Sequence, residues 1–122
     1  MPASPSKIAE RYAFDMFAMA NLPPTDTGVK GAVIWVSVGE FAGADIQHGP
    51  RIKVVVGNKI NKEGLRNSVS VKLTDPPEMV GTLPGKIAQQ VSEFVDKNRA
   101  TLLQYWNEEI STKEMLGLLV PV

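Results

Sequence analysis

The stretch LPGKIAQQVSEFVDKNRATLLQYWNEEI, residues 83–110, carries the strongest periodic pattern in the chain. Its apolar residues recur at intervals of three and four, which is the spacing of one face of an α-helix. Polar residues such as Gln90, Glu93 and Lys97 fall on the opposite face. The pattern predicts one long amphipathic helix over about residues 84–109. The apolar face comprises Ile87, Val91, Phe94, Val95, Leu102, Tyr105 and Trp106.

Three runs that precede this helix predict strands. AVIWVSV (32–38) is apolar on both sides, as in a doubly covered strand, whereas RIKVVV (51–56) and SVSVKLT (68–74) alternate between two faces. The segments that join the runs are too short to hold a crossover helix, so we expect antiparallel pairing.

Together these signals predict a small α+β domain, in which a three-stranded antiparallel sheet packs on one long C-terminal helix. We expect an N-terminal helix and loop at 1–30, the sheet at 31–75 and a helical part at 84–122, all in a single domain of 122 residues. STKE (111–114) has the spacing of a capping box, which predicts the start of a short final helix.

The composition excludes several classes of site and partner. Thirteen basic and thirteen acidic residues balance, so long-range steering towards nucleic acid is not expected. No cysteine is present, which removes disulfides, thiolate nucleophiles and cysteine-based zinc sites. We expect no metal and no cofactor. The start lacks a secretory signal, and no apolar run reaches the ~20 residues that span a bilayer. We therefore expect a cytoplasmic protein of bacterial type without a membrane partner.

His48 is the one histidine of the chain, and it lies in a Gly-Pro turn before the strand that carries Arg51 and Lys53. An imidazole beside two cations could move a proton while the cations hold a phosphate. A small nuclease-like enzyme that uses His48 and Arg51 as catalytic residues is therefore one hypothesis. The alternative is a turn histidine that faces solvent.

Alternation places Arg51, Lys53 and Lys72 on one face of the predicted sheet. With Trp35 added as a stacking ring, this face has the residue types of a nucleic-acid platform. A nucleic-acid-binding regulator is thus a second hypothesis, and an ordinary solvated sheet face is the alternative.

A helix formed by YAFDMFAMA (12–20) would be apolar around most of its circumference, so it must be buried against other residues. It either covers the second face of the sheet or packs against a second copy. We expect a homodimer or another protein partner, with an interface formed by Tyr12, Phe14, Met16, Phe17 and Met19.

Five segments in order carry a family resemblance: IWVSV (34–38), HGPRIKV (48–54), VSVKL (69–73), LPGKIAQQVSEFV (83–95) and NRATLLQYWNEEI (98–110). The closing LLVPV (118–122) adds to it. Over residues 31–122 the chain resembles a small bacterial family, the domain of unknown function numbered four thousand one hundred and sixty, or a sister family. The resemblance implies the α+β fold but no reaction, because that family's activity is unassigned. The sequence as a whole favours a non-enzymatic binding or interaction module that self-associates.

Overall fold

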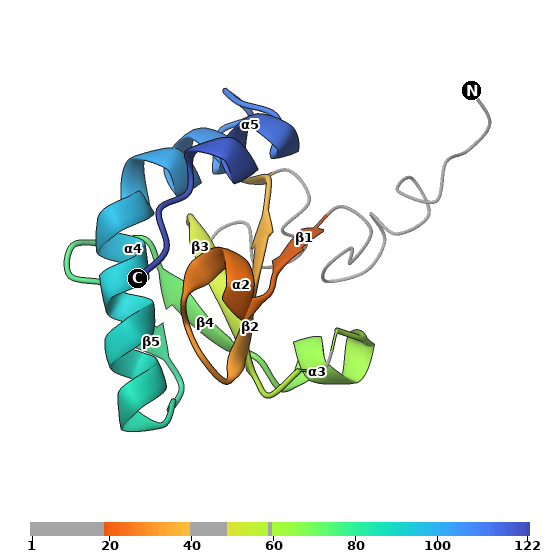
Figure 1. The fold of residues 1–122 in the computed structure, drawn as a ribbon, viewed down its shortest axis with the longest axis vertical. Helices are drawn as coiled ribbons and strands as arrows, with labels where there is room; N and C mark the ends of the chain where they lie inside the picture. Colours follow the sequence, from red (N-terminus) through yellow and green to blue (C-terminus); the bar gives the residue numbers. More distant parts are fainter. Residues whose placement is uncertain (1–18, 40–48, 59) are drawn as a thin grey trace.

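The chain folds into an antiparallel sheet with a long helix across one face (Figure 1). The computed structural model describes residues 19–39, 49–58 and 60–122. In chain order the elements are β1 (Met19–Leu22), α2 (Pro24–Thr27), β2 (Ala32–Ser37), β3 (Arg51–Val56), α3 (Lys62–Arg66), β4 (Val69–Lys72), β5 (Glu78–Val80), α4 (Gly85–Trp106) and α5 (Thr112–Leu118).

Within the described residues the sheet has five strands in the order β1-β2-β3-β4-β5, and each strand pairs antiparallel with the next. The predicted α+β class and antiparallel pairing are confirmed, but the prediction of three strands is wrong. Met19 falls at helical spacing with the residues before it, which predicts a helix up to residue 20 and a loop from Asn21 onwards, yet the backbone of β1 pairs with β2 from Met19–Ser37 to Leu22–Ile34. β5 was missed because it is three residues long and lies between Pro and Gly.

The apolar face of α4 packs on the sheet as its periodicity predicts. Val91, Phe94 and Val95 are fully buried and share a core with Ile52 and Val54 of β3. α4 ends at Trp106, slightly before the expected position, because Glu108 adopts a left-handed conformation with φ 59°. None of the helices in the described part of the chain is both long and apolar enough to cross a membrane.

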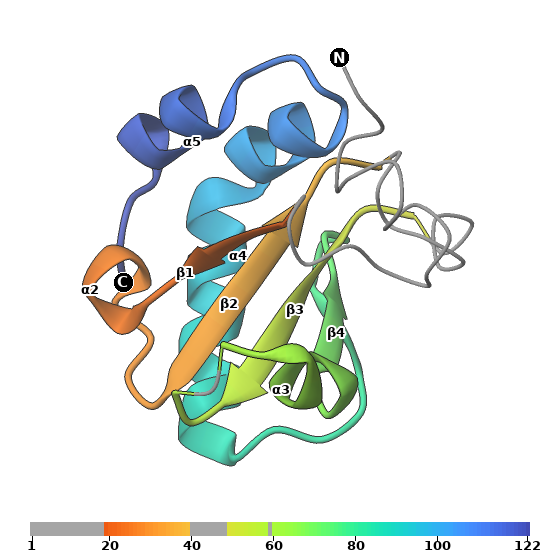
Figure 2. The ribbon, with the colours of Figure 1, turned by 90° about the vertical axis from the view of Figure 1, so that its right-hand side faces the viewer.

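The predicted capping box forms at the start of α5. The Ser111 Oγ accepts a hydrogen bond from the Glu114 amide (3.1 Å), and the Glu114 carboxylate accepts one from the Ser111 amide (3.0 Å). Met115 anchors α5 with a fully buried side chain. The following segment, residues 119–122, returns to α2, where the Val122 amide donates to the Thr27 carbonyl at 2.9 Å (Figure 2).

The second face of the sheet carries a smaller apolar cluster of Met19, Val33, Trp35, Val55 and Leu65. Leu65 belongs to α3, the short helix that lies between β3 and β4 in the chain. Asn61 caps α3 by accepting a hydrogen bond from the Gly64 amide at 2.9 Å.

The predicted interface falls largely outside the described residues, which do not include Tyr12, Phe14, Met16 and Phe17. Met19 is described, and its assignment to a helix is wrong because it pairs with Ser37 in the sheet. Its side chain is buried in the second-face cluster.

Candidate functional site

The strand register brings the predicted cations to one face of the sheet. Arg51 lies opposite Lys72, and Lys53 lies opposite Ser70, so their side chains point the same way. Trp35 lies opposite Lys53 and shares this face. The grouping predicted from alternation is therefore present in the structure.

The surroundings of these side chains differ from those of an open phosphate site. Arg51 is 5% exposed, its guanidinium lies 5.5 Å from the Trp106 ring centroid, and it donates to the Gly49 carbonyl at 3.3 Å. The Lys72 ammonium lies 3.3 Å from the Glu78 carboxylate. His48 falls outside the described residues. Arg51 and Lys72 thus already contact other residues of the chain.

Trp35 is 2% exposed, so in this conformation its ring cannot stack on a base. Its indole N–H has no hydrogen-bond partner within the described structure. Trp35 therefore acts through packing against Val33 and Val55 rather than as a platform for a ligand.

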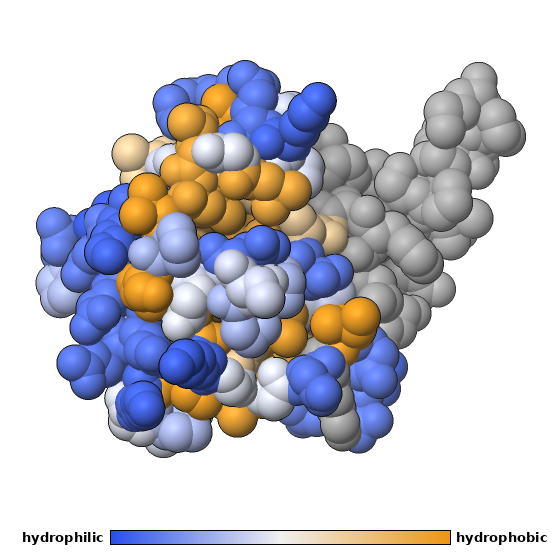
Figure 3. Space-filling model, in the orientation of Figure 1, coloured by the Kyte–Doolittle hydropathy of each residue, from blue (hydrophilic) through white to orange (hydrophobic). Residues whose placement is uncertain are grey.

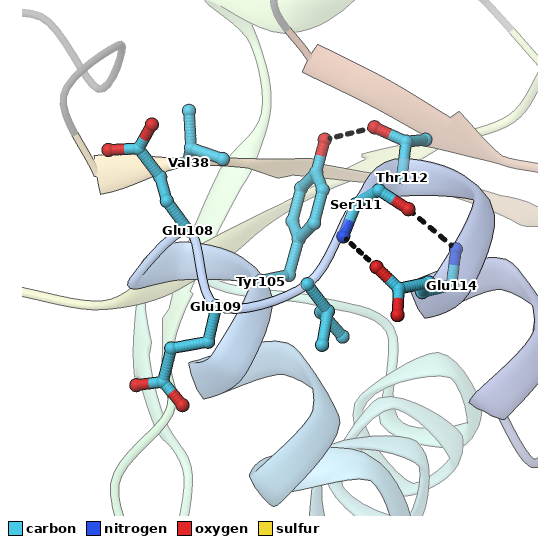
Figure 4. Close-up of a pocket in the computed structure, with 8 residues that line it drawn as sticks. Val38, Tyr105, Glu108, Glu109, Ser111, Thr112 and Glu114 are labelled. Carbon is cyan, nitrogen blue, oxygen red and sulfur yellow. Dashed lines mark hydrogen bonds between the residues drawn. The ribbon is translucent and has the colours of Figure 1, made fainter.

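An open hollow of about 570 Å³ lies where β2 and α4 end and α5 begins (Figure 4). Because α4 stops at Trp106 and the capping box starts α5 soon afterwards, the connecting residues form its wall. A hydrogen bond of 2.9 Å joins the hydroxyls of Tyr105 and Thr112 across it. The lining residues are Val38, Tyr105, Glu108, Glu109, Ile110, Ser111, Thr112 and Glu114.

The hollow is acidic. Glu108, Glu109 and Glu114 supply three carboxylates, whereas Lys113 is the one basic residue in the sequence 107–122. Glu108 and Glu109 are exposed, and Figure 4 shows them on the side of the hollow away from Thr112. Such a group of carboxylates favours cationic side chains of a partner.

Apolar side chains follow the acidic residues along the chain. Leu116, Leu118 and Val120 are 46%, 53% and 50% exposed. Figure 3 shows apolar surface gathered over α5 and the C-terminal segment. Three half-exposed apolar side chains within five residues leave more apolar surface at this end of the chain than single scattered residues would. We call these three residues, with Glu108, Glu109 and Glu114, the apolar-acidic surface.

Sequence reasoning did not identify this surface, although a signal was present. The short final helix and the residue after it carry Met115, Leu116, Leu118 and Leu119. A helix this short can bury one side, and Met115 occupies it. The segment contains more leucines than one buried face of a short helix can hold, and this pattern predicts exposed apolar residues here.

In residues 19–39, 49–58 and 60–122, no three His, Asp or Glu side chains are grouped so as to hold a metal ion. Compared with models of known protein families, with curated proteins and with solved structures, the chain gives no match. The family resemblance of residues 31–122 remains a prediction.

Proposed function

We propose that the protein is a non-enzymatic interaction module that binds a protein partner through the apolar-acidic surface. The observation that carries this proposal is that Leu116, Leu118 and Val120 are about half exposed in the same C-terminal part of the chain that supplies the three carboxylates of the hollow. Apolar contact would supply the affinity, and the carboxylates would select partners with basic side chains.

The surface is held in place by contacts on its inner side. Met115 is fully buried, the capping box fixes the start of α5, and Asn98 bonds the backbone of Val120. A surface that is ordered before binding loses less conformational entropy when a partner docks. The rigidity of α5 and residues 119–122 therefore supports a binding role.

The two hypotheses that use the basic sheet face receive less support. A nuclease or nucleic-acid platform needs accessible cations and an accessible ring, but Arg51 and Trp35 are buried. The resemblance to a family without an assigned activity adds no reaction to either hypothesis.

Site-specific photo-crosslinking tests the proposal. A photoreactive phenylalanine analogue is placed at Leu116 in one variant and at Gln89 in a control. Gln89 is an exposed residue of α4 outside the apolar-acidic surface. We expect protein adducts of defined mass from position 116 that disappear when Leu118→Glu is added. Equal adduct yields from positions 116 and 89 would overturn the proposal.

A further inference from the structure

Residues 111–122, which we call the arm, supply the last part of the hydrophobic core. The arm comprises the capping residue Ser111, α5 and the segment that runs from α5 to α2 (Figure 2). Met115 is fully buried in the main core, and Leu119 and Val122 pack against that core. The arm therefore uses its inner side to bind the rest of the chain.

Hydrogen bonds fix the backbone of the arm in one position. Asn98 of α4 donates to the Val120 carbonyl at 2.8 Å and accepts from the Val120 amide at 2.7 Å. The Val122 amide donates to the Thr27 carbonyl at 2.9 Å, and Gly28 lacks the Cβ atom that would clash with Val122. These bonds join the arm to α2 and α4, so a second copy of the chain offers the same donors and acceptors.

The turn between α4 and the arm contains a strained residue. α4 ends at Trp106, so residues 107–110 form the turn. Glu108 has a φ of 59°, and it is the one non-glycine residue with a positive φ in the part of the chain that the structure describes. A side chain raises the free energy of the left-handed conformation. Opening the turn therefore releases strain.

We propose that the arm exchanges between two copies of this chain. In the exchanged dimer the turn at 107–110 opens, and the arm of each copy takes the place of the other copy's arm. Met115 then fills the core of the other copy, and Val120 bonds the other copy's Asn98. Every contact of the arm is kept and the strain at Glu108 is released, so the cost is mainly the association of two molecules. Short hinges under strain favour this kind of exchange.

The exchange goes beyond the proposed function, because it uses the inner side of the arm. Leu116 and Leu118 are exposed on the arm and make no part of the exchanged contacts. They stay available to a protein partner in the monomer and in the dimer. The exchange is reciprocal, so both copies are complete and assembly stops at two.

Crosslinking between two different variants tests the exchange. The chain has no cysteine, Lys97 and Pro121 are exposed, and the Lys97 Nζ lies 3.5 Å from the Pro121 carbonyl oxygen. Lys97→Cys and Pro121→Cys chains are unfolded together in urea, refolded at high concentration and treated with a short bismaleimide. We expect a covalent heterodimer, because exchange brings position 121 of one copy to position 97 of the other. Gln89→Cys replaces Lys97→Cys in the control mixture, which should give only background.

A substitution in the turn tests the role of Glu108. Glu108→Gly, added to both chains, removes the strain from the monomer, so we expect the heterodimer yield to fall at least about fivefold. Glu109→Gly is the matched control, because it removes an adjacent exposed carboxylate from a position without a positive φ. It should not lower the yield in this way.

Two results would overturn the inference: a heterodimer yield no higher than that of the Gln89 control, or a yield that Glu108→Gly lowers no more than Glu109→Gly does. Circular dichroism of each refolded variant verifies that it is folded before crosslinking. Neither result bears on the proposed function, which is tested by the adducts from position 116.

Discussion

The buried side chain of Asn98 ties the C-terminal segment to α4. Its amide donates to the Phe94 carbonyl (2.9 Å) and the Val120 carbonyl (2.8 Å), and its carbonyl oxygen accepts from the Val120 amide (2.7 Å). Asn98 is 2% exposed, so this amide is fully removed from water. This polar side chain can lie on the buried side of α4 because the backbone of Val120 satisfies its hydrogen-bonding groups.

Replacing Asn98 by leucine should therefore destabilise the fold. Leucine has the same branched side-chain shape but offers no hydrogen bond to Val120, and we expect a loss of about 1–3 kcal/mol in the free energy of unfolding. Urea denaturation measures the loss, and faster hydrogen exchange at Val120 would localise it. Gln89→Leu on the exposed side of α4 is the control, and an equal effect of both substitutions would contradict the role given to Asn98.

Gly28 allows the end of residues 119–122 to approach α2 closely. Its φ is 78°, and a Cβ atom added there would clash with the carbonyl oxygen of Val122. Gly31 has nearly the same φ, 83°, but its Cβ would meet only the Ile87 Cδ1 at 3.7 Å. Comparing alanine substitutions at Gly28 and Gly31 therefore separates the free-energy cost of a left-handed alanine from the cost of the clash with Val122.

We expect Gly28→Ala to be more destabilising than Gly31→Ala. Both variants pay about 1–2 kcal/mol for a left-handed alanine, and Gly28→Ala should lose about 1–3 kcal/mol more by displacing Val122. Thermal and urea unfolding of the two variants measure the difference. Identical losses would show that residues 119–122 do not need this close approach.

The helix α5 combines an inner anchor with an outer binding surface, and the two can be tested separately. Met115→Ala should cost about 2–5 kcal/mol because it opens a cavity under α5. Leu116→Ala should leave stability within about 0.5 kcal/mol, because Leu116 is half exposed. Urea unfolding of both variants gives the two values. A large loss of stability in Leu116→Ala would mean that Leu116 supports the fold rather than partner binding.

The sequence predicts those helices and strands whose pattern is long and regular. α4 follows from its repeated apolar residues, and β3 and β4 follow from alternation. β1 and β5 are short, and their residues favour other structures locally, so only pairing in the folded sheet reveals them. Tertiary contacts override weak local preferences at these two edges.

The candidate site was harder to predict than the fold. Alternation correctly groups Arg51, Lys53 and Lys72, but it cannot show that Trp106, far along the chain, lies beside Arg51 and that this cation is buried. The hollow depends on where α4 stops, which is set by the left-handed Glu108. Exposure and long-range contact are properties of the folded chain, and the local pattern does not encode them.

For partner binding, the carboxylates of the apolar-acidic surface predict a dependence on salt. Glu108, Glu109 and Glu114 line the hollow, whereas the total charge of the chain is zero. Salt at about 0.5 M reduces the Debye length from about 10 Å at 0.1 M to less than half of that value. We expect the crosslink yield at position 116 to fall several-fold over this range. A crosslinking series at matched protein concentrations checks it, and a yield that rises with salt would indicate an apolar contact without charge pairing.

Crosslinking from position 116 examines the binding role of the apolar-acidic surface most directly. We expect adducts of defined mass from position 116 that disappear when Leu118→Glu is added and weaken when Glu108→Lys and Glu109→Lys are added, while position 89 on α4 gives none above background. Adducts that survive all three substitutions, or equal yields from positions 116 and 89, would contradict partner binding through this surface.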